Sequence, residues 1–352
     1  MSNASRLLSA PLALALLGSA CAADAPMTDA QHRNQALLTV KGGIAADLGE
    51  LVTACQALRD AAPTPDADGW SASADAPAVT AMRGHWLRAR QAYERVEGAI
   101  AVLFPDLDVS TDQRYDGFLS DEIPTHRDDD LFDGEGVTGV HAVERILWAD
   151  AHPARVVAFE MGVPGYVPAA FPASAAEATR FRDGLLERLV RDVTQMQRDF
   201  APLALDTPAA FRGVIGSVQE QVEKIEAAAS AEEESRYAQA TLADMRANLA
   251  GARRTWEAFV PWVRARGGEA LATRVDARFA ALQAAYAEIQ GDALPPPPEG
   301  WDPDAPSAAH LATPYGRLRA TLLGESDPAR AGSLAAEMNA AADLLSIARL
   351  PE

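Results

Sequence analysis

His141 and Glu144 stand three residues apart in the apolar run GVHAVERILW (139–148). On an α-helix this spacing places the two side chains on one face, one turn apart. An imidazole nitrogen and a carboxylate oxygen placed in this way can share one metal ion, or can hydrogen-bond to each other. The same spacing occurs on ordinary helix surfaces, so whether this pair forms a metal site depends on which other residues of the chain lie next to it.

A second pair of carboxylates, Glu94 and Glu97, repeats the one-turn spacing in a segment expected to be helical, 78–103. Carboxylates near the apolar face of a helix are either solvated or part of a charged site. The following segment, 105–135, holds eleven acidic residues against two arginines. It lacks the alternating ligands, central glycine and closing glutamate of a calcium loop. We interpret it as an acidic loop whose His126 joins a site only if the loop folds back.

The net charge limits the classes of partner. The chain of 352 residues has a formal net charge of −19. Nucleic acid and anionic membrane surfaces would be repelled, whereas cations are attracted. The sequence has no Gly-rich phosphate loop and no serine or cysteine in a recognisable nucleophile elbow. We therefore expect no nucleic-acid partner.

The amino terminus predicts export. Residues 1–22 combine a positive residue, an apolar stretch at 7–18 and small residues around Cys21. The run 17–21 also resembles a bacterial lipoprotein box, in which Cys21 would become the lipidated first residue. We expect the mature chain in the periplasm or cell envelope, held to a membrane only through that lipid anchor. Cys55, the other cysteine, lies in an apolar helical pattern and is expected to be buried.

The rest of the chain predicts helices joined by polar or Pro-rich connections, because apolar residues recur at helical spacing between them. The class we expect is therefore all-α. Two expected helices are 78–103 and the one that carries His141 and Glu144, which we call the HxxE helix. The others are 31–61, 175–200, 208–229, 232–264, 267–290 and 313–350. Long connections are expected at 149–174 and 293–306.

Several motifs occur in a fixed order along the chain. They are YERVE (93–97), DLD (106–108), DQR (112–114), GVHAVERILW (139–148) and EESRY (233–237). Together they resemble the imelysin-like family, and within it the EfeO/EfeM-type periplasmic iron-uptake components. The likeness spans most of the mature chain, so it is far more specific than HxxE alone.

The resemblance implies an all-helical fold of two related bundles, an imelysin-like domain at 31–352 divided into 31–205 and 206–352. It also implies a metal site at the HxxE helix. Carried over position by position, the implied ligands are His141, Glu144, Glu94, Glu97 and Asp112. A further carboxylate from a later helix is expected, with Glu223 as the nearest candidate. Val140 replaces the usual Phe of the motif, and 238–239 replace Ser-His.

The implied function is that of an exported protein that captures iron, or another divalent or trivalent cation such as zinc. The implied partners are an inner-membrane iron permease and a peroxidase-type protein. One imidazole with several carboxylates is a hard ligand set that suits iron, manganese or zinc better than Cu(I). Two alternatives stay open. HxxE also supplies two zinc ligands in some carboxypeptidases, which suggests a zinc-dependent imelysin-type peptidase. The third reading is a protein that binds an acidic polysaccharide through a bridging metal ion.

Overall fold

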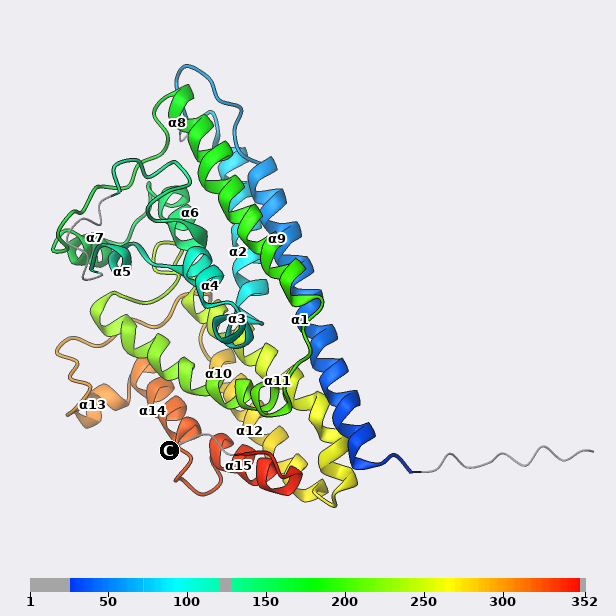
Figure 1. Ribbon diagram of the computed structural model, residues 1–352. Helices are drawn as coiled ribbons and strands as arrows, with labels where there is room; N and C mark the ends of the chain where they lie inside the picture. The colour runs from blue at the N-terminus through cyan, green and yellow to red at the C-terminus, as the bar shows by residue number, and fades with distance from the viewer. Residues whose placement is uncertain (1–25, 72, 121–127, 349–352) are drawn as a thin grey trace, which may run out of the picture.

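The computed structural model describes residues 26–71, 73–120 and 128–348. Every regular element within these ranges is helical, which confirms the all-α class (Figure 1). None of the helices in these ranges combines the length and apolar character that crossing a bilayer requires. The predicted export signal with Cys21, and the acidic-segment residue His126, lie outside the described residues.

The chain forms long helices in both halves and several short ones around residues 97–160. In chain order the elements are α1 (Asp29–Asp60), α2 (Ala76–Glu94), α3 (Glu97–Leu103), α4 (Pro105–Asp112), α5 (Tyr115–Ser120), α6 (Gly139–Leu147), α7 (Ala154–Glu160), α8 (Ala175–Arg180), a π-helical segment η1 (Phe181–Leu186), α9 (Glu187–Phe200), α10 (Thr207–Ala227), a 3₁₀ turn η2 (Ala228–Ser230), α11 (Thr241–Ala265), α12 (Glu269–Ala287), α13 (Ala308–Leu311), α14 (Pro314–Ser326) and α15 (Leu334–Leu345).

By their contacts the helices form a first helix group, α1, α2, α4, α6 and α9, and a second helix group, α10, α12, α14 and α15. Helix α1 runs along one side of the molecule and packs against α2 and α9, while α12, α14 and α15 lie at the end opposite α8 (Figure 1). Helix α11 contacts α1 and α2 as well as α10, α12 and α15, so it joins the two groups. One continuous set of buried apolar side chains runs through both. The predicted boundary near residue 205 falls in the connection between α9 and α10, and the division into separate bundles there stays a prediction.

The predicted helix 78–103 is divided. Helix α2 ends at Glu94, α3 begins at Glu97, and the N–H of Val96 bonds to the carbonyl of Tyr93 in a tighter turn. The Arg95 carbonyl meets α11 at Gly251, where a Cβ atom would lie only 2.3 Å from the carbonyl oxygen. This close approach brings α11 beside the two glutamates that flank the break.

The acidic segment is not a simple loop. Residues 105–120 form α4 and α5, joined by a short bend. Pro105 ends α3 and also takes the first position of α4, where a missing N–H costs nothing because that group has no helical partner. Elsewhere the expectation for Cys55 is confirmed: it is buried in α1, and burial raises the pKa of its thiol to about 12.

Candidate metal centre

Helix α6, which carries His141 and Glu144, is buried over its whole length. Trp86 of α2 donates its indole N–H to the carbonyl of Val140 at 2.7 Å. Arg83, one turn earlier in α2, donates to the carbonyl of Leu147 at the other end of α6, at 2.8 Å from Nε. Two contacts from one helix therefore fix both the position and the rotation of α6.

The start of α6 lies directly against the end of α4. Gly139 has a φ of +91°, and a Cβ at this position would lie 2.2 Å from the carbonyl oxygen of Thr111. Only glycine meets both conditions, because other residues are strained at positive φ and would collide with the α4 backbone. The contact places Asp112, the last residue of α4, beside His141.

Glu144 holds the ring of His141 in a defined orientation. His141 Nδ1 lies 2.9 Å from Glu144 Oε2, which assigns the ring proton to Nδ1. The other oxygen, Oε1, accepts the backbone N–H groups of Tyr237 at 2.9 Å and Ala238 at 2.8 Å. Burial, with Arg90, lowers the pKa of His141, so the imidazole is neutral and its Nε2 carries a free lone pair.

His141 Nε2 is buried without a hydrogen-bond partner among the described residues. The atom that faces it is Asp112 Oδ1, at 3.3 Å. A lone pair that faces a carboxylate oxygen at this distance is repelled unless a proton or a cation lies between them. Glu234 completes the arrangement, since one ligand atom each from Asp112, His141 and Glu234 lie within 4.8 Å of one another. We call these three residues the histidine group.

A second set of carboxylates lies next to the histidine group and shares Glu234 with it. Ligand atoms of Glu94, Glu97 and Glu234 also lie within 4.8 Å of one another. The ammonium of Lys224 from α10 lies among them, 2.9 Å from Glu97 Oε2 and 3.0 Å from Glu234 Oε2. Glu220, one turn earlier in α10, adds an oxygen at 3.3 Å from the same ammonium. We call Glu94, Glu97, Glu220 and Glu234 the inner carboxylate group.

One buried guanidinium joins the two groups. Arg90 is fully buried and pairs with Asp112, Glu94 and Glu234, and its Nε lies 3.5 Å from Asp244 Oδ2. Together, Arg90 and Lys224 face six carboxylates in the cluster. A buried cluster with this excess of acid holds protons.

The carboxylates of the cluster fall into two sets, one with raised and one with lowered pKa values. Burial raises the pKa of Asp112 to about 8, that of Glu220 to about 9, and that of Glu94 well above its usual value. Burial acts in the same direction on Glu97 and Glu234. Lys224 nevertheless holds the pKa of Glu97 below its usual value, and Lys224 with Arg90 does so for Glu234. Glu234 is therefore ionised and Asp112 carries a proton at neutral pH.

The cluster reaches solvent at Glu220, whose side chain is 24% exposed, and at the edge of the histidine group. The side chains of Asp112 and Glu234 are 15% and 17% exposed, whereas His141 is only 2% exposed and Glu144 is fully buried. An ion from solvent would therefore meet the two carboxylates first and the imidazole last.

The fold brings the site residues predicted from the sequence into one cluster, but they have different neighbours there. His141 and Asp112 lie in the histidine group, and Glu94 and Glu97 in the inner carboxylate group. Glu144 contacts His141 and two backbone N–H groups instead. Glu223, the expected later carboxylate, is exposed on α10.

The residue of the histidine group that sequence reasoning missed is Glu234. It stands in the EESRY motif, but the segment from 232 was predicted as helix. Helix α11 starts only at Thr241, and residues 231–240 form a turn-rich connection. Two residues that flank the motif, Ala231 and Gln239, have positive φ angles of 66° and 54°. This strained path turns Glu234 toward Arg90 and the Tyr237 N–H toward Glu144.

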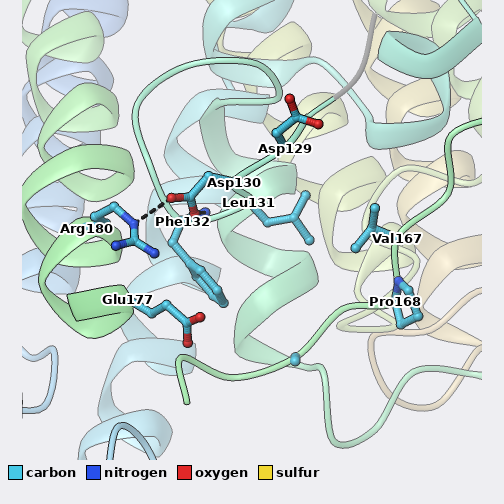
Figure 2. Close-up of a pocket in the computed structure, with 9 residues that line it drawn as sticks. Asp129, Asp130, Leu131, Phe132, Val167, Pro168, Glu177 and Arg180 are labelled. Carbon is cyan, nitrogen blue, oxygen red and sulfur yellow. Dashed lines mark hydrogen bonds and ion pairs between the residues drawn. The ribbon is translucent and has the colours of Figure 1, made fainter. Parts of the chain in front are cut away.

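A cavity of about 240 Å³ lies apart from this cluster (Figure 2). Its lining residues are Asp129, Asp130, Leu131, Phe132, Val167, Pro168, Ala170, Glu177 and Arg180. None of them belongs to the histidine group or the inner carboxylate group. Figure 2 shows Asp130 paired with Arg180, at 2.5 Å, so part of the acidic segment is neutralised by α8.

Comparison with known proteins gives a consistent result. A sequence model of the imelysin family matches residues 44–324. The iron uptake system component EfeO of Escherichia coli (strain K12) is 27% identical over 274 residues, which are 78% of this chain and 59% of that protein. The same figures hold for EfeO of Shigella flexneri. The chain thus spans about three fifths of the length of these relatives.

The fold also matches a solved structure. The crystal structure of an imelysin-like protein from Psychrobacter arcticum 273-4 superposes with a TM-score of 0.59 at 12% sequence identity. The match covers 89% of this chain and 97% of that one. At this identity the likeness shows that the two proteins share a fold.

Proposed function

The chain belongs to the imelysin family, and from this membership and its buried histidine group we propose that it captures a metal cation, iron above all, for uptake at the cell envelope. The iron-uptake role is that of the relatives named EfeO. Its extension to this chain rests on the chemistry of the site, because the chain matches only part of those proteins.

The observation that carries the proposal is the unpartnered Nε2 of His141. This nitrogen has no hydrogen-bond partner among the described residues, and a cation that displaces the Asp112 proton would supply a partner. The lone pair faces Asp112 Oδ1 at 3.3 Å, and Glu144 fixes the tautomer that leaves this lone pair free. A ligand histidine whose second nitrogen is held by a carboxylate is the usual arrangement at protein metal sites.

The proposal gives each predicted residue a role. His141, Asp112 and Glu234 hold the cation, and Glu144 positions His141. Glu94 and Glu97 lie behind these ligands in the inner carboxylate group. One nitrogen and two carboxylates form a hard donor set that suits Fe(II), Fe(III), Mn(II) or Zn(II).

The path of the ion follows from exposure. Asp112 and Glu234 form the partly exposed edge of the site, so we propose that the ion enters and leaves there. The receiving partner would be an inner-membrane iron permease, with a peroxidase-type protein in the same system. Export through residues 1–22, with lipid attachment at Cys21, belongs to the same proposal.

The peptidase alternative needs His141 and Glu144 as joint zinc ligands with an activated water molecule. Both oxygens of Glu144 already accept hydrogen bonds, from the His141 ring and from two backbone N–H groups. These contacts support cation binding rather than hydrolysis. A peptide-cleavage assay on the metal-loaded protein, run beside the titration below, would reveal a peptidase.

The test is calorimetric titration of the chelator-stripped protein with Fe(II) under anaerobic conditions, and with Mn(II), Zn(II) and Cu(II). We expect one ion per chain, with affinity reduced at least about a hundredfold in His141→Ala because a ligand is lost. The matched control is His32→Ala in α1, which should bind as the unsubstituted protein does. Equal affinity in His141→Ala, or no binding of any ion, would refute the proposal.

A further inference from the structure

Lys224 occupies the centre of the inner carboxylate group. Its side chain is 1% exposed, and its ammonium lies 3.1 Å from each oxygen of Glu94 and 2.9 Å from Glu97 Oε2. Contacts to Glu234 at 3.0 Å and Glu220 at 3.3 Å surround it further. An ammonium has three N–H donors, and carboxylates surround all of them here.

The two halves of the cluster therefore differ in what they lack. In the inner carboxylate group the positive charge is already supplied by a residue of the chain, since Lys224 donates to Glu94 and Glu97. In the histidine group Arg90 pairs with Asp112 and Glu234, but the Nε2 atom of His141 has no partner among the described residues. Both halves bring three ligand atoms within 4.8 Å of one another, so ligand spacing alone does not distinguish them.

We propose that Lys224 is a built-in cation that closes the inner carboxylate group to metal ions and confines the chain to one metal ion, on the histidine side. The inference deepens the proposed function and rests on it. A metal ion and a buried ammonium among the same oxygens repel each other strongly, because the interior screens charge poorly. Lys224 also contacts Glu234, the carboxylate that the two groups share, and so positions it between them.

The inner carboxylate group has a distinct preference once the ammonium is gone. Its donors are the carboxylate oxygens of Glu94, Glu97, Glu220 and Glu234, with no imidazole. Oxygen-only sets suit Mn(II), Ca(II) and Mg(II), whereas an imidazole favours Zn(II) and iron. Removal of Lys224 should therefore create a second site with the selectivity of a hard-ion site.

The experiment compares Lys224→Met, which keeps most of the length of the side chain but removes the charge, with Lys224→Arg, which keeps the charge. Mn(II) binding to the full chain is counted by electron paramagnetic resonance of the free ion, with and without competing Ca(II). We expect one Mn(II) in the unsubstituted protein and in Lys224→Arg, and two in Lys224→Met. Circular dichroism checks that each variant is folded.

The His141→Ala background separates the two hypotheses. We expect no bound ion in His141→Ala, and one, displaced by Ca(II), in His141→Ala/Lys224→Met. The proposed function fails if His141→Ala binds like the unsubstituted protein, whereas a gain of one ion on removal of Lys224 would support the role of Lys224 even then.

Two results would overturn the inference. One is an unchanged count in folded Lys224→Met. The other is an unsubstituted protein that binds two ions, of which one persists in His141→Ala. The second result needs no Lys224 variant, so the inference can be overturned even if Lys224→Met does not fold.

Discussion

In the proposed metal site Glu144 would act on the ion through the ring of His141. One of its oxygens accepts a hydrogen bond from Nδ1–H of His141, and the other accepts hydrogen bonds from two backbone N–H groups. In Glu144→Gln the amide keeps one acceptor oxygen, so either the ring or the backbone N–H groups lose their acceptor. We expect metal affinity to fall roughly 10- to 100-fold, the usual cost of losing an outer-sphere partner of a ligand histidine. Calorimetry measures it.

The control is Glu226→Gln, which removes a half-exposed glutamate that pairs with Arg319 on α14, away from the cluster. It should leave the affinity unchanged. If Glu144→Gln also bound normally, the orientation of His141 would not depend on Glu144.

The proton on Asp112 makes binding depend on pH. Burial raises the pKa of this carboxyl to about 8, so below that pH the free protein holds a proton where the complex holds a cation. A group protonated in the free state and ionised in the complex makes binding weaken as pH falls. We expect affinity to rise up to about tenfold per pH unit between pH 6 and 8 and to level off above.

Calorimetry in two buffers of different ionisation enthalpy counts the protons released, and we expect about one per ion at pH 7. Equal affinity at pH 6 and pH 8, with no proton released, would contradict a protonated Asp112.

At this scale the sequence predicted the residues that belong to motifs and missed those whose role depends on a turn. His141 was singled out because HxxE is a local helical pattern, and Asp112 because the family resemblance implied it. Glu234 was missed because its segment was expected to be helical, and left-handed residues such as Gln239 carry no reliable sequence signal. Lys224 was missed for another reason: a search for ligands looks for acids and histidines and passes over the cation that neutralises them.

At the scale of elements, the contact between α4 and α6 positions the histidine group. Gly139→Ala places a methyl group about where the Thr111 carbonyl lies and strains a φ of +91°. We expect the free energy of unfolding to fall by roughly 2 to 4 kcal/mol. Metal affinity should fall as well, because α4 must shift and take Asp112 away from His141. Urea denaturation and metal titration of the same sample measure the two effects.

Gly84→Ala is the matched control. Gly84 is exposed in α2, and a Cβ there would meet nothing within 4 Å. The substitution should raise the free energy of unfolding by roughly 0.5 to 1 kcal/mol, because alanine favours a helix. A Gly139→Ala protein as stable as the unsubstituted one would show that the α4 contact is not needed.

Helical periodicity predicted 31–61 and 175–200 well, since they closely match the elements observed. The predicted helix 313–350 is instead divided into α14 and α15, and the predicted connection 149–174 contains α7. Helical periodicity was least accurate where contacts between helices determine where a helix ends. The break between α2 and α3 lies where Gly251 of α11 approaches the Arg95 carbonyl, a contact that no local pattern reports. The expected helix 78–103 ends just before Pro105, and a proline is equally suited to the first turn of a new helix, here α4.

At the scale of the whole molecule, the histidine group joins parts of the chain that are distant in sequence. Asp112 ends α4, His141 lies in α6, and Glu234 lies in the connection before α11. Helix α11 packs against both helix groups. An ion held by these three residues would therefore connect α4 and α6 to the segment that leads into α11. The all-α class was predictable from helical spacing. The convergence of positions 112 and 141 was expected only from the family resemblance, and that of position 234 was not expected, because no spacing rule relates the three positions.

This arrangement predicts that a bound ion stabilises the molecule as a whole. A ligand that binds only the folded state adds about 2.7 kcal/mol at a free concentration one hundred times its Kd. For a chain of this size the melting temperature should rise by a few degrees. Calorimetric scans with and without Mn(II) measure the shift. The shift should vanish in His141→Ala and persist in His32→Ala, because only the former removes a ligand. If ions instead bound diffusely to the acidic surface of a chain with net charge −19, the two variants would respond alike, and the stabilisation would disappear in high salt.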